Sequence, residues 1–476
     1  MVETLNSNLQ QISFHDPDGN VFEIDGRLLR RVSQQAGCRL LKLLSSQLAT
    51  DLVDDKLIPA TRALSSGDLF SIGIENEEGA YIWFEHYRIP FISYAYEWIP
   101  EMLLAAAELT LTLVKRLNAH GWDLKDGSTN NVVFEGSRPI FIDLCSIIEC
   151  SNEPYWLAKG QYERHFILPL MAYIYRTLPP NHIHFSNADG LDPLALSGLL
   201  GFKKWTSTLS IKHCALPVML STSKGRQLHK GFGYIDSGAN AAAKEWQLGS
   251  IESSLAIIKR KLPSPASKWH AYTSEREHYS EDSIHEKRNI VARWIKLASP
   301  ETVLDLGANT GEFSILATKT ATRVLAFEKD IDSARLAYQN IKAADAHCQV
   351  FLQDLGNPSP ALGWRQIEKK SISQRIVGKV DCVLVLAILH HWLVSSSIPL
   401  PEILLQLAQW TKRYVIVEYI SPEDPKFKLI CTQRRVEFIW LTLAEFRRHL
   451  NHNFSIIEEV ELKDTYRTLF YCERLT

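Results

Sequence analysis

The residues best suited to chemistry lie in the second half of the chain, after the first of several short apolar runs. The segment TVLDLGANTGEF, residues 302–313, is typical of a strand, a turn containing Gly307 and Gly311, and the start of a helix. Glycine at both positions allows a sharp turn and lets a ligand lie against the main chain. The free N–H groups that begin a helix favour an anionic group. Asp305, just before the turn, would repel phosphate and attract an ammonium.

Two further carboxylates follow the next two apolar runs. Glu328, in LAFEKD, stands twenty-one residues after Gly307 (328 − 307), where a carboxylate can accept both hydroxyls of a ribose. Asp354, in FLQDLG, is placed to accept the amino group of adenine. The D-x-G-x-x-x-G turn alone is a weak signal, and Asp354 alone could be a helix cap or a surface turn, but their joint occurrence at successive strand ends favours a cofactor site. Together these groups match S-adenosylmethionine.

This combination resembles the class I S-adenosylmethionine-dependent methyltransferase family over roughly the last two hundred residues. The resemblance implies an α/β domain with a Rossmann-like, mostly parallel seven-stranded sheet and an antiparallel edge hairpin. It also implies that the exit of the fourth strand, in DCVLVLAILHHW, lies near the transferable methyl group. The cofactor-binding residues implied by the family are Asp305, Gly307, Asn309, Gly311, Glu328, Asp354 and Ala387.

Two histidines at the exit of that strand are the candidates for catalysis. A general base is needed when the acceptor is a hydroxyl or a protonated amine, and imidazole suits that task near neutrality. We therefore predict that His390 or His391 is the base, with a packed pair that shapes the adenosine pocket as the alternative. Glu418, in VIVEY, is interpreted as a strand-end cap, and a second interpretation places it facing the acceptor.

The elements that must position these groups follow from the apolar pattern. An amphipathic helix is predicted over residues 284–297. His278 and Tyr279 come just before this helix, and the family resemblance implies that they close over the cofactor. Apolar runs alternate with helical segments and predict a parallel sheet. The predicted strands are residues 302–306, 323–327, 348–352, 380–387 and 414–419, and the edge hairpin comprises residues 454–460 and 467–472.

A second polar constellation lies in the first half, in HGWDLKDGSTNNVVFEGSRPIFIDLCS. It resembles the catalytic loop and metal-binding hairpin of protein-kinase-like and aminoglycoside-phosphotransferase-like folds. That resemblance implies Asp126 as the base, Asn131 and Asp143 as ligands of Mg, and ATP as the nucleotide. The sequence departs from the pattern, because Leu and Cys follow Asp143 and no Gly-rich phosphate loop or Val-Ala-x-Lys strand is present. Arg30 and Arg31 are the nearby cations, and a plain β-hairpin with turn-forming Asp and Asn is the alternative.

The first half is predicted to be a separate α+β domain over residues 1–265 that serves acceptor recognition. Its resemblance to kinase-like folds implies a degenerate kinase-like form. Strands are predicted at 20–24, 69–74 and 81–87, and helices at 38–52 and 100–119. Two prolines and a basic cluster between residues 259 and 274 indicate the boundary. The methyltransferase domain would then occupy residues 275–476.

Composition limits the partners that the chain is expected to have. The 476 residues carry 52 Lys+Arg against 54 Asp+Glu, so charge gives no support to a nucleic-acid or membrane partner. No secretory signal is visible, and the apolar stretch 166–175 is about half as long as a spanning helix. Eight scattered cysteines suit a reducing compartment. We expect a cytoplasmic protein with a small-molecule, glycan or protein acceptor, and the oligomeric state stays open.

The whole chain also looks like bacterial nodulation-associated methyltransferase-like proteins. This resemblance rests on LKDGSTNNVVFEGSRPIFID, YERHFILPLMAY and DLGNPSPALGW, so it covers both halves. The sequence therefore predicts a methyltransferase whose first half contributes acceptor recognition. Two alternatives remain: an enzyme that both phosphorylates and methylates, and a non-catalytic module that binds S-adenosylmethionine.

Overall fold

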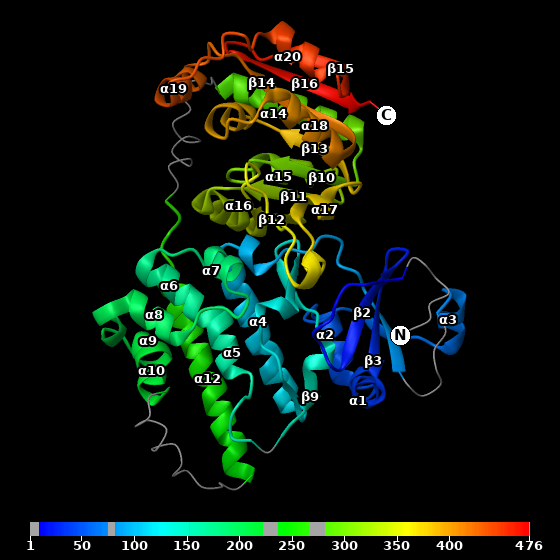
Figure 1. The fold of residues 1–476 in the computed structure, drawn as a ribbon, viewed down its shortest axis with the longest axis vertical. Coiled ribbons are helices and arrows are strands. Elements are labelled where there is room, and N and C mark those ends of the chain that lie inside the picture. The colour runs from blue at the N-terminus through cyan, green and yellow to red at the C-terminus, as the bar shows by residue number, and fades with distance from the viewer. Residues whose placement is uncertain (1–8, 75–80, 152, 222–236, 267–280, 476) are drawn as a thin grey trace. The chain divides into compact units, whose positions relative to one another are not determined.

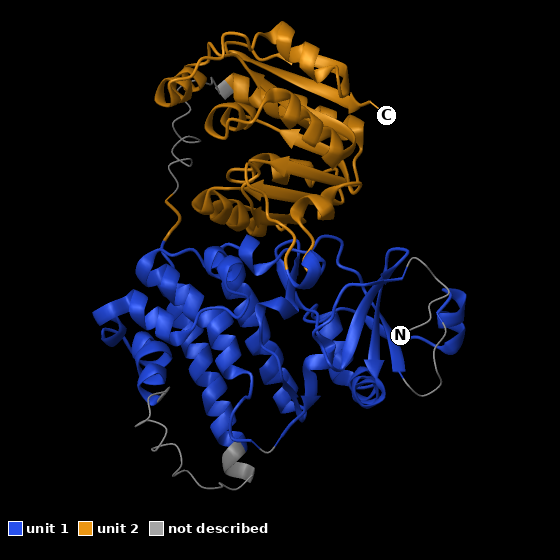
Figure 2. Ribbon diagram, viewed as in Figure 1, with its two compact units in different colours: residues 1–263, 363–368 blue, residues 264–362, 369–476 orange. Residues whose placement is uncertain are grey.

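The computed structural model describes residues 9–74, 81–151, 153–221, 237–266 and 281–475 (Figure 1). The chain divides into two compact units, which Figure 2 colours separately. Unit 1 comprises residues 1–263 and 363–368, and unit 2 comprises residues 264–362 and 369–476. The sequence gives no sign that the short segment 363–368, which interrupts unit 2, groups with unit 1.

Unit 1 begins with a five-stranded antiparallel sheet of order β1-β2-β3-β5-β4. Its strands span Gln10–Gln11, Gly19–Ile24, Arg27–Ser33, Thr61–Ala63 (β4) and Tyr81–His86 (β5). Phe22, Leu29 and Trp83 belong to the apolar cluster that packs against this sheet. The sequence pattern missed β3, because RLLRRVS carries arginines on a strand that is largely covered.

Two predictions for this region are wrong for local reasons. The single helix expected over residues 38–52 is two helices, α1 (Gln34–Leu44) and α2 (Gln47–Asp54), because the Ser46 hydroxyl caps a new helix by accepting the Ala49 N–H at 3.3 Å. The strand expected over residues 69–74 is instead helix α3 (Ser66–Ser71). A reciprocal capping box between Ser65 and Asp68 starts that helix.

The long helix predicted over residues 100–119 is confirmed as α4 (Pro100–Ala119), which begins with a proline at its first position. Short strands follow it: β6 (Trp122–Leu124) pairs with β9 (Ile147–Glu149), and β7 (Val132–Glu135) pairs with β8 (Arg138–Phe141). The loops between these strands carry the polar constellation of the first half.

The rest of unit 1 is helical in the described residues. Its α-helices are Lys159–Tyr162 (α5), Leu168–Arg176 (α6), Pro180–Ser186 (α7), Pro193–Leu200 (α8), Thr208–Ser210 (α9), Leu216–Ser221 (α10) and Ser237–Lys261 (α12). The shorter 3-10 and π turns of unit 1 lie at Ala95–Glu97, Thr129–Asn131, Leu144–Ser146, Glu163–Ile167, Gly201–Trp205 and Ile211–Ala215.

Unit 2 contains a seven-stranded sheet of order β12-β11-β10-β13-β14-β16-β15. The strands from β10 to β14 are parallel, and β16 runs antiparallel between β14 and β15. All five predicted parallel strands and the edge hairpin are confirmed. The bounds are Thr302–Leu306 (β10), Arg323–Glu328 (β11), Cys348–Leu352 (β12), Val380–Val385 (β13), Thr411–Ile420 (β14), Phe454–Glu461 (β15) and Arg467–Arg474 (β16).

Helices connect the parallel strands. The strand order extends from β10 toward β12 on one side and toward β14 on the other, and such connections are right-handed, so the helices lie on both faces of the sheet. Each residue of β10 and β12 is buried, as expected for strands covered on both faces. The helices are Glu281–Ala298 (α14), Glu312–Ala317 (α15), Ile331–Ala343 (α16), Ile372–Ile376 (α17), Leu400–Trp410 (α18), Pro425–Arg434 (α19) and Leu443–Leu450 (α20), with short turns at Trp364–Gln366 and His391–Ser395.

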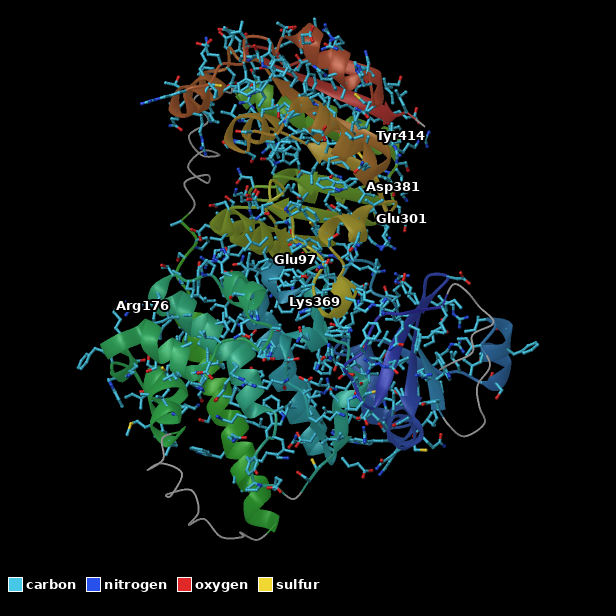
Figure 3. All side chains as sticks on the ribbon, in the orientation of Figure 1. Glu97, Arg176, Glu301, Lys369, Asp381 and Tyr414 are labelled. Atoms are coloured by element: carbon cyan, nitrogen blue, oxygen red, sulfur yellow. The ribbon has the colours of Figure 1, made fainter. Side chains whose placement is uncertain are left out.

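The two edges of the parallel strands differ in what they offer a ligand. At the amino edge, Asp381 is occupied, because it accepts the Thr302 N–H at 2.8 Å and pairs with Lys412 at 2.6 Å (Figure 3). We call the opposite edge, where β10, β11, β12 and β13 end, the carboxyl edge. Ligands of open parallel sheets bind at that edge, and the predicted cofactor residues lie there.

Candidate active site

The turn after β10 is shaped by two glycines with left-handed backbone angles. Gly307 has φ +72° and Gly311 has φ +82°. A Cβ at Gly307 would stand 2.7 Å from Cδ1 of Ile388, so this turn and the exit of β13 lie in direct contact. Gly307 and Ala308 both donate their N–H groups to the Phe327 carbonyl, which fixes the turn against β11. A side chain at Gly307 would therefore disturb both strand exits.

Asp305 is a buried carboxylate beneath this turn. It is 2% exposed and accepts a hydrogen bond from the Ser314 hydroxyl at 2.6 Å. Burial raises the pKa of Asp305 to about 6, against the opposing Ser314 hydrogen bond, and Glu328 adds to the rise. A cationic ligand group would offset that cost, so the position suits an ammonium.

Glu328 ends β11 and faces the same turn. Its two carboxylate oxygens accept the Asn309 and Asp330 N–H groups, each at 2.8 Å. Burial raises the pKa of Glu328, while these backbone bonds oppose the rise. Each oxygen keeps a further lone pair for a ligand hydroxyl. The side-chain oxygen of Asn309 is buried and has no hydrogen-bond partner in the described part of the chain.

Asp354 follows β12 at the same edge, since the next residue back, Gln353, donates its N–H to the Glu328 carbonyl at 2.7 Å. Its two oxygens are engaged: one accepts the Gly356 N–H at 2.9 Å, and the other pairs with Lys329 at 2.6 Å. The structure thus brings Asp305, Gly307, Asn309, Gly311 and Glu328 together. It leaves Asp354 beside them in a turn that already uses its carboxylate. Helix α15 after Gly311 is only six residues long, and its first residue, Glu312, pairs with Arg288.

The exit of β13 carries Ala387 and the two histidines. Ala387 has a left-handed φ of 56°, which turns the chain toward Ile388 and the glycine turn. The His390 and His391 rings lie 4.1 Å apart between centroids. Burial lowers the pKa of His391 to about 4, with Arg467 adding to the effect, and lowers the pKa of His390 well below its usual value. Both imidazoles are therefore neutral near pH 7.

A buried network of charges lies next to the histidines and was not predicted from the sequence. Glu418 is fully buried and pairs with Lys287 at 2.7 Å and with Arg467 at 3.3 Å. Arg467 also donates to Asp424 at 3.2 Å. Burial would raise the pKa of Glu418, but Lys287 and Arg467 outweigh it and lower the pKa to about 2. The expectation that Glu418 caps a strand end is wrong, since β14 continues to Ile420 and Glu418 joins three elements.

One signal in the sequence could have found this network. Lys287 stands three residues after Ile284 and four before Val291, so it lies on the apolar stripe of α14. Glu418 likewise interrupts the apolar run VIVEYI. A cation and an anion that each occupy a buried position need each other, because an unpaired buried charge is costly.

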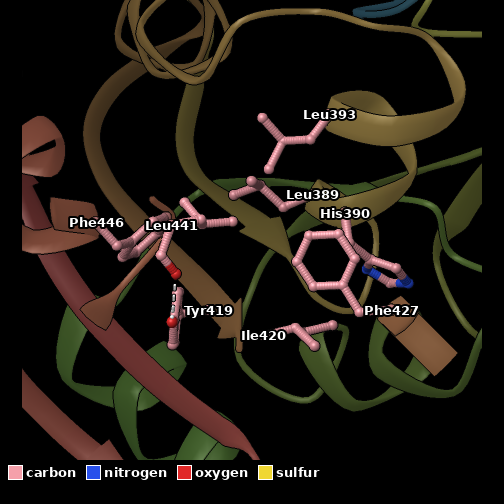
Figure 4. Close-up of a pocket in the computed structure, with 8 residues that line it drawn as sticks. All are labelled: Leu389, His390, Leu393, Tyr419, Ile420, Phe427, Leu441 and Phe446. Carbon is pink, nitrogen blue, oxygen red and sulfur yellow. Dashed lines mark hydrogen bonds between the residues drawn. The ribbon is translucent and has the colours of Figure 1, made fainter. Parts of the chain in front are cut away.

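His390 also lines a small apolar pocket (Figure 4). Its lining residues are Leu389, His390, Leu393, Tyr419, Ile420, Phe427, Leu441 and Phe446. The Tyr419 hydroxyl donates to the Leu441 carbonyl at 2.8 Å, so the polar atom of that ring is already satisfied. The pocket therefore offers apolar contact only, apart from His390.

In unit 1 the structure brings Asn131 and Asp143 to adjacent strand ends, because the Ile142 N–H donates to the Asn131 carbonyl at 2.8 Å. Asp126 lies in the preceding loop, where its carboxylate accepts the Ser128 N–H at 3.0 Å and its carbonyl accepts the Asn131 amide at 3.5 Å. The three predicted residues are thus close in space. Their carboxylate and amide groups partly stabilise the loop itself.

The cation next to Asp143 is Arg30, one of the two arginines singled out in the sequence. Arg30 is 9% exposed on β3 and donates directly to Asp143. Asp16, Asp143 and Cys145 hold ligand atoms within 4.8 Å of one another, but the Arg30 guanidinium already compensates Asp143 and lies 3.9 Å from Asp16. A metal ion at Asp143 would have to displace this ion pair.

One expectation from the sequence cannot be placed in the structure. His278 and Tyr279 lie outside the described residues. In the described part of the chain, no helix is both long enough and apolar enough to cross a membrane.

The strand order decides the fold of the second unit. Five parallel strands in the order 3-2-1-4-5 are followed by a seventh strand inserted antiparallel between the fifth and the sixth. Unit 2 has the class I methyltransferase fold. The predicted α/β architecture with its antiparallel edge hairpin is therefore confirmed, while the kinase-like form of unit 1 stays a prediction.

The chain is similar to several known proteins. No family model matches the chain. Nodulation protein NoeA of Rhizobium meliloti (strain 1021) is 27% identical over 473 residues, which cover 97% of this chain and 95% of the relative. The N-methyltransferase NodS from Bradyrhizobium japonicum WM9 is 12% identical, with a TM-score of 0.30, and covers 41% of this chain and 99% of its own. Magnesium protoporphyrin IX methyltransferase (ChlM) from Synechocystis PCC 6803, solved with bound S-adenosylhomocysteine, is 18% identical, with a TM-score of 0.31. The match covers 43% of this chain and 94% of the ChlM chain.

Proposed function

We propose that the chain is an S-adenosylmethionine-dependent methyltransferase whose cofactor binds at the carboxyl edge of unit 2. The observation that carries the proposal is the set of polar groups around one glycine turn. A buried carboxylate with a raised pKa, a buried amide oxygen without a partner and a two-oxygen carboxylate meet there, at Asp305, Asn309 and Glu328. Such a set complements an ammonium and a ribose diol.

Each predicted cofactor residue is proposed to contact one part of S-adenosylmethionine. Asp305 and the Asn309 oxygen accept the ammonium of the methionine part, and Gly307 and Gly311 keep the turn open for close approach. Glu328 accepts the ribose hydroxyls through its remaining lone pairs. Asp354 lies beside the adenine, with Lys329 shielding its charge. Ala387 leads the chain to the reacting side.

The cofactor supplies an activated methyl group on a sulfonium, and the protein aligns the acceptor with it and excludes water. The exit of β13 is in contact with the glycine turn through Ile388, so His390 and His391 are proposed to line the reacting side. As neutral imidazoles they can hydrogen-bond an acceptor, and either one is proposed as a base for an acceptor that carries a proton.

Unit 1 is proposed to contribute recognition of the acceptor, which is a small molecule, a glycan or a protein. The support is that the similarity to NoeA spans both units, so the two halves recur together in one chain of similar length.

Calorimetric titration of the full chain with S-adenosylhomocysteine tests the cofactor site. We expect binding to the wild type and a loss of at least about tenfold in affinity for Asp305→Ala, because the ammonium loses a buried partner. Asp381→Asn is the matched control, since Asp381 also accepts a backbone N–H but lies at the amino edge. Unchanged affinity in Asp305→Ala would refute the site. Binding without methyl transfer to any fraction of a cell extract would favour a non-catalytic module.

A further inference from the structure

The imidazole of His390 is a buried polar group that lacks a partner. His390 is 2% exposed, and neither Nδ1 nor Nε2 has a hydrogen-bond partner within the described residues. Figure 4 shows the His390 ring beside the Phe427 ring, with the two nitrogens in blue. Buried polar atoms in proteins are nearly always hydrogen-bonded, so two orphaned atoms on one ring indicate a position that a ligand completes.

His390 lies where an acceptor must approach. Ile388, two residues before it, contacts the glycine turn at Gly307, and His390 itself packs against His391 and Phe427 with centroids 4.1 and 5.9 Å apart. The orphaned nitrogens therefore belong to the exit of β13, beside the proposed cofactor site.

The charges that face His390 are mostly positive. Lys287 on α14, Arg467 on β16 and Lys426 on α19 all disfavour its protonation, as does the neighbouring His391. The carboxylates of this cluster are Glu418 on β14 and Asp424 before α19, and both are engaged by Arg467, at 3.3 and 3.2 Å. Asp305 and Glu312 also act on Lys287. The charges that act most strongly on His390 itself are all positive.

Cations around a buried ring without a hydrogen-bond partner favour a ligand of opposite charge. The sulfonium of a bound cofactor would add a further positive charge. Burial and Arg467 lower the pKa of Lys426 to about 8, which an adjacent anion would raise again. A neutral imidazole has one N–H donor to offer such an anion.

We propose that the methyl acceptor of unit 2 is an oxygen anion, a carboxylate or a phosphate monoester, which binds the ring N–H of His390 and the positive charge of Lys426. This inference rests on the proposed function. The acceptor oxygen supplies the electron pair of the new O–C bond, and the S–C bond of S-adenosylmethionine breaks with its pair on sulfur. No proton has to be removed, so His390 binds and orients the acceptor in this reaction and is not its base.

The test uses the full chain saturated with S-adenosylhomocysteine and titrated with inorganic phosphate or, in a second arm, with acetate, at neutral pH and constant ionic strength. The readout is the NMR signals of the His390 and His391 rings. We expect saturable shifts, with affinity reduced by about fivefold or more in Lys426→Met and in His390→Phe, where His391 reports. Lys428→Met is the matched control, because Lys428 is exposed on the same helix and pairs with Glu423.

The outcomes separate this inference from the proposed function. Failure of the wild type to bind S-adenosylhomocysteine would count against the proposed function itself. If the nucleoside binds, the inference is overturned when neither anion binds up to about 50 mM. It is also overturned when affinity is the same in Lys426→Met and His390→Phe as in the wild type, or when neutral glycerol shifts the signals equally. Tighter phosphate binding would indicate a phosphate monoester, and tighter acetate binding a carboxylate.

Discussion

At the scale of single residues, Asp305 shows that the site is built at the expense of stability. Its carboxylate is buried, and its pKa of about 6 stands above the ordinary value of 3.8. In the unfolded chain the group ionises at the ordinary value, so the free energy of unfolding falls as pH rises from about 4 to 6 and is then constant. A ligand that binds through the charge of Asp305 would explain why the chain keeps a side chain that lowers its free energy of unfolding.

Asp305→Asn is therefore expected to stabilise the ligand-free chain. The substitution keeps a side-chain oxygen for the Ser314 hydroxyl and removes the buried charge, for a gain of about 1–3 kcal/mol in the free energy of unfolding. The same variant should lose affinity for S-adenosylhomocysteine. Urea unfolding and calorimetry measure both effects, and a less stable variant that still binds would contradict the assignment.

The affinity for S-adenosylhomocysteine should depend on pH through the same group. Below a pH of about 6 the ligand ammonium must first displace a proton from Asp305, so affinity falls up to about tenfold for each further pH unit. Above that pH the carboxylate is already ionised and the affinity is constant. Dissociation constants measured across this range check the prediction, and a flat profile in the wild type would refute it.

At the scale of elements, the glycine turn and the exit of β13 are one structural unit. Gly307→Ala would combine a strained φ of +72° with a Cβ 2.7 Å from Ile388, and we expect a loss of about 2–3 kcal/mol in the free energy of unfolding. Gly121→Ala is the control, because its φ is +80° but its surroundings are open, and it should cost about 1 kcal/mol. Equal losses in the two variants would show that the contact with Ile388 is unimportant.

The Glu418 network links α14, β14 and β16. Glu418→Gln would leave Lys287 and Arg467 buried beside each other without their common anion, and we expect a loss of about 3–5 kcal/mol. The exposed Glu445, which pairs with Arg448, is the comparison, and Glu445→Gln should leave the free energy of unfolding nearly unchanged. Since the pKa of Glu418 is about 2, its contribution is present above pH 4.5 and is lost as pH falls toward 2.

The sequence predicted what depends on local pattern. Unbroken apolar strands, the glycine turn and the carboxylates after each strand are visible without a structure, and they led to the fold of unit 2 and to Asp305, Asn309 and Glu328. What it could not predict depends on partners far along the chain, such as the pairing of Lys287 with Glu418, 131 residues away. Residues 69–74 failed for another reason, because a single capping box overrode an apolar run.

At the scale of the whole molecule, the two units have separate cores and only unit 2 carries the proposed cofactor site. We therefore expect two calorimetric transitions on heating the full chain, with S-adenosylhomocysteine raising the temperature of one of them. Asp305→Ala should abolish that shift and leave the other transition unchanged. A single transition that moves as a whole would show that the two units unfold together.

The most direct test of the account is a crystal structure of the chain with S-adenosylhomocysteine. We predict that the ammonium of the ligand lies at Asp305 and its ribose hydroxyls at the Glu328 carboxylate, with the sulfur directed toward the exit of β13. A ligand bound elsewhere, or a ribose that does not contact Glu328, would contradict it.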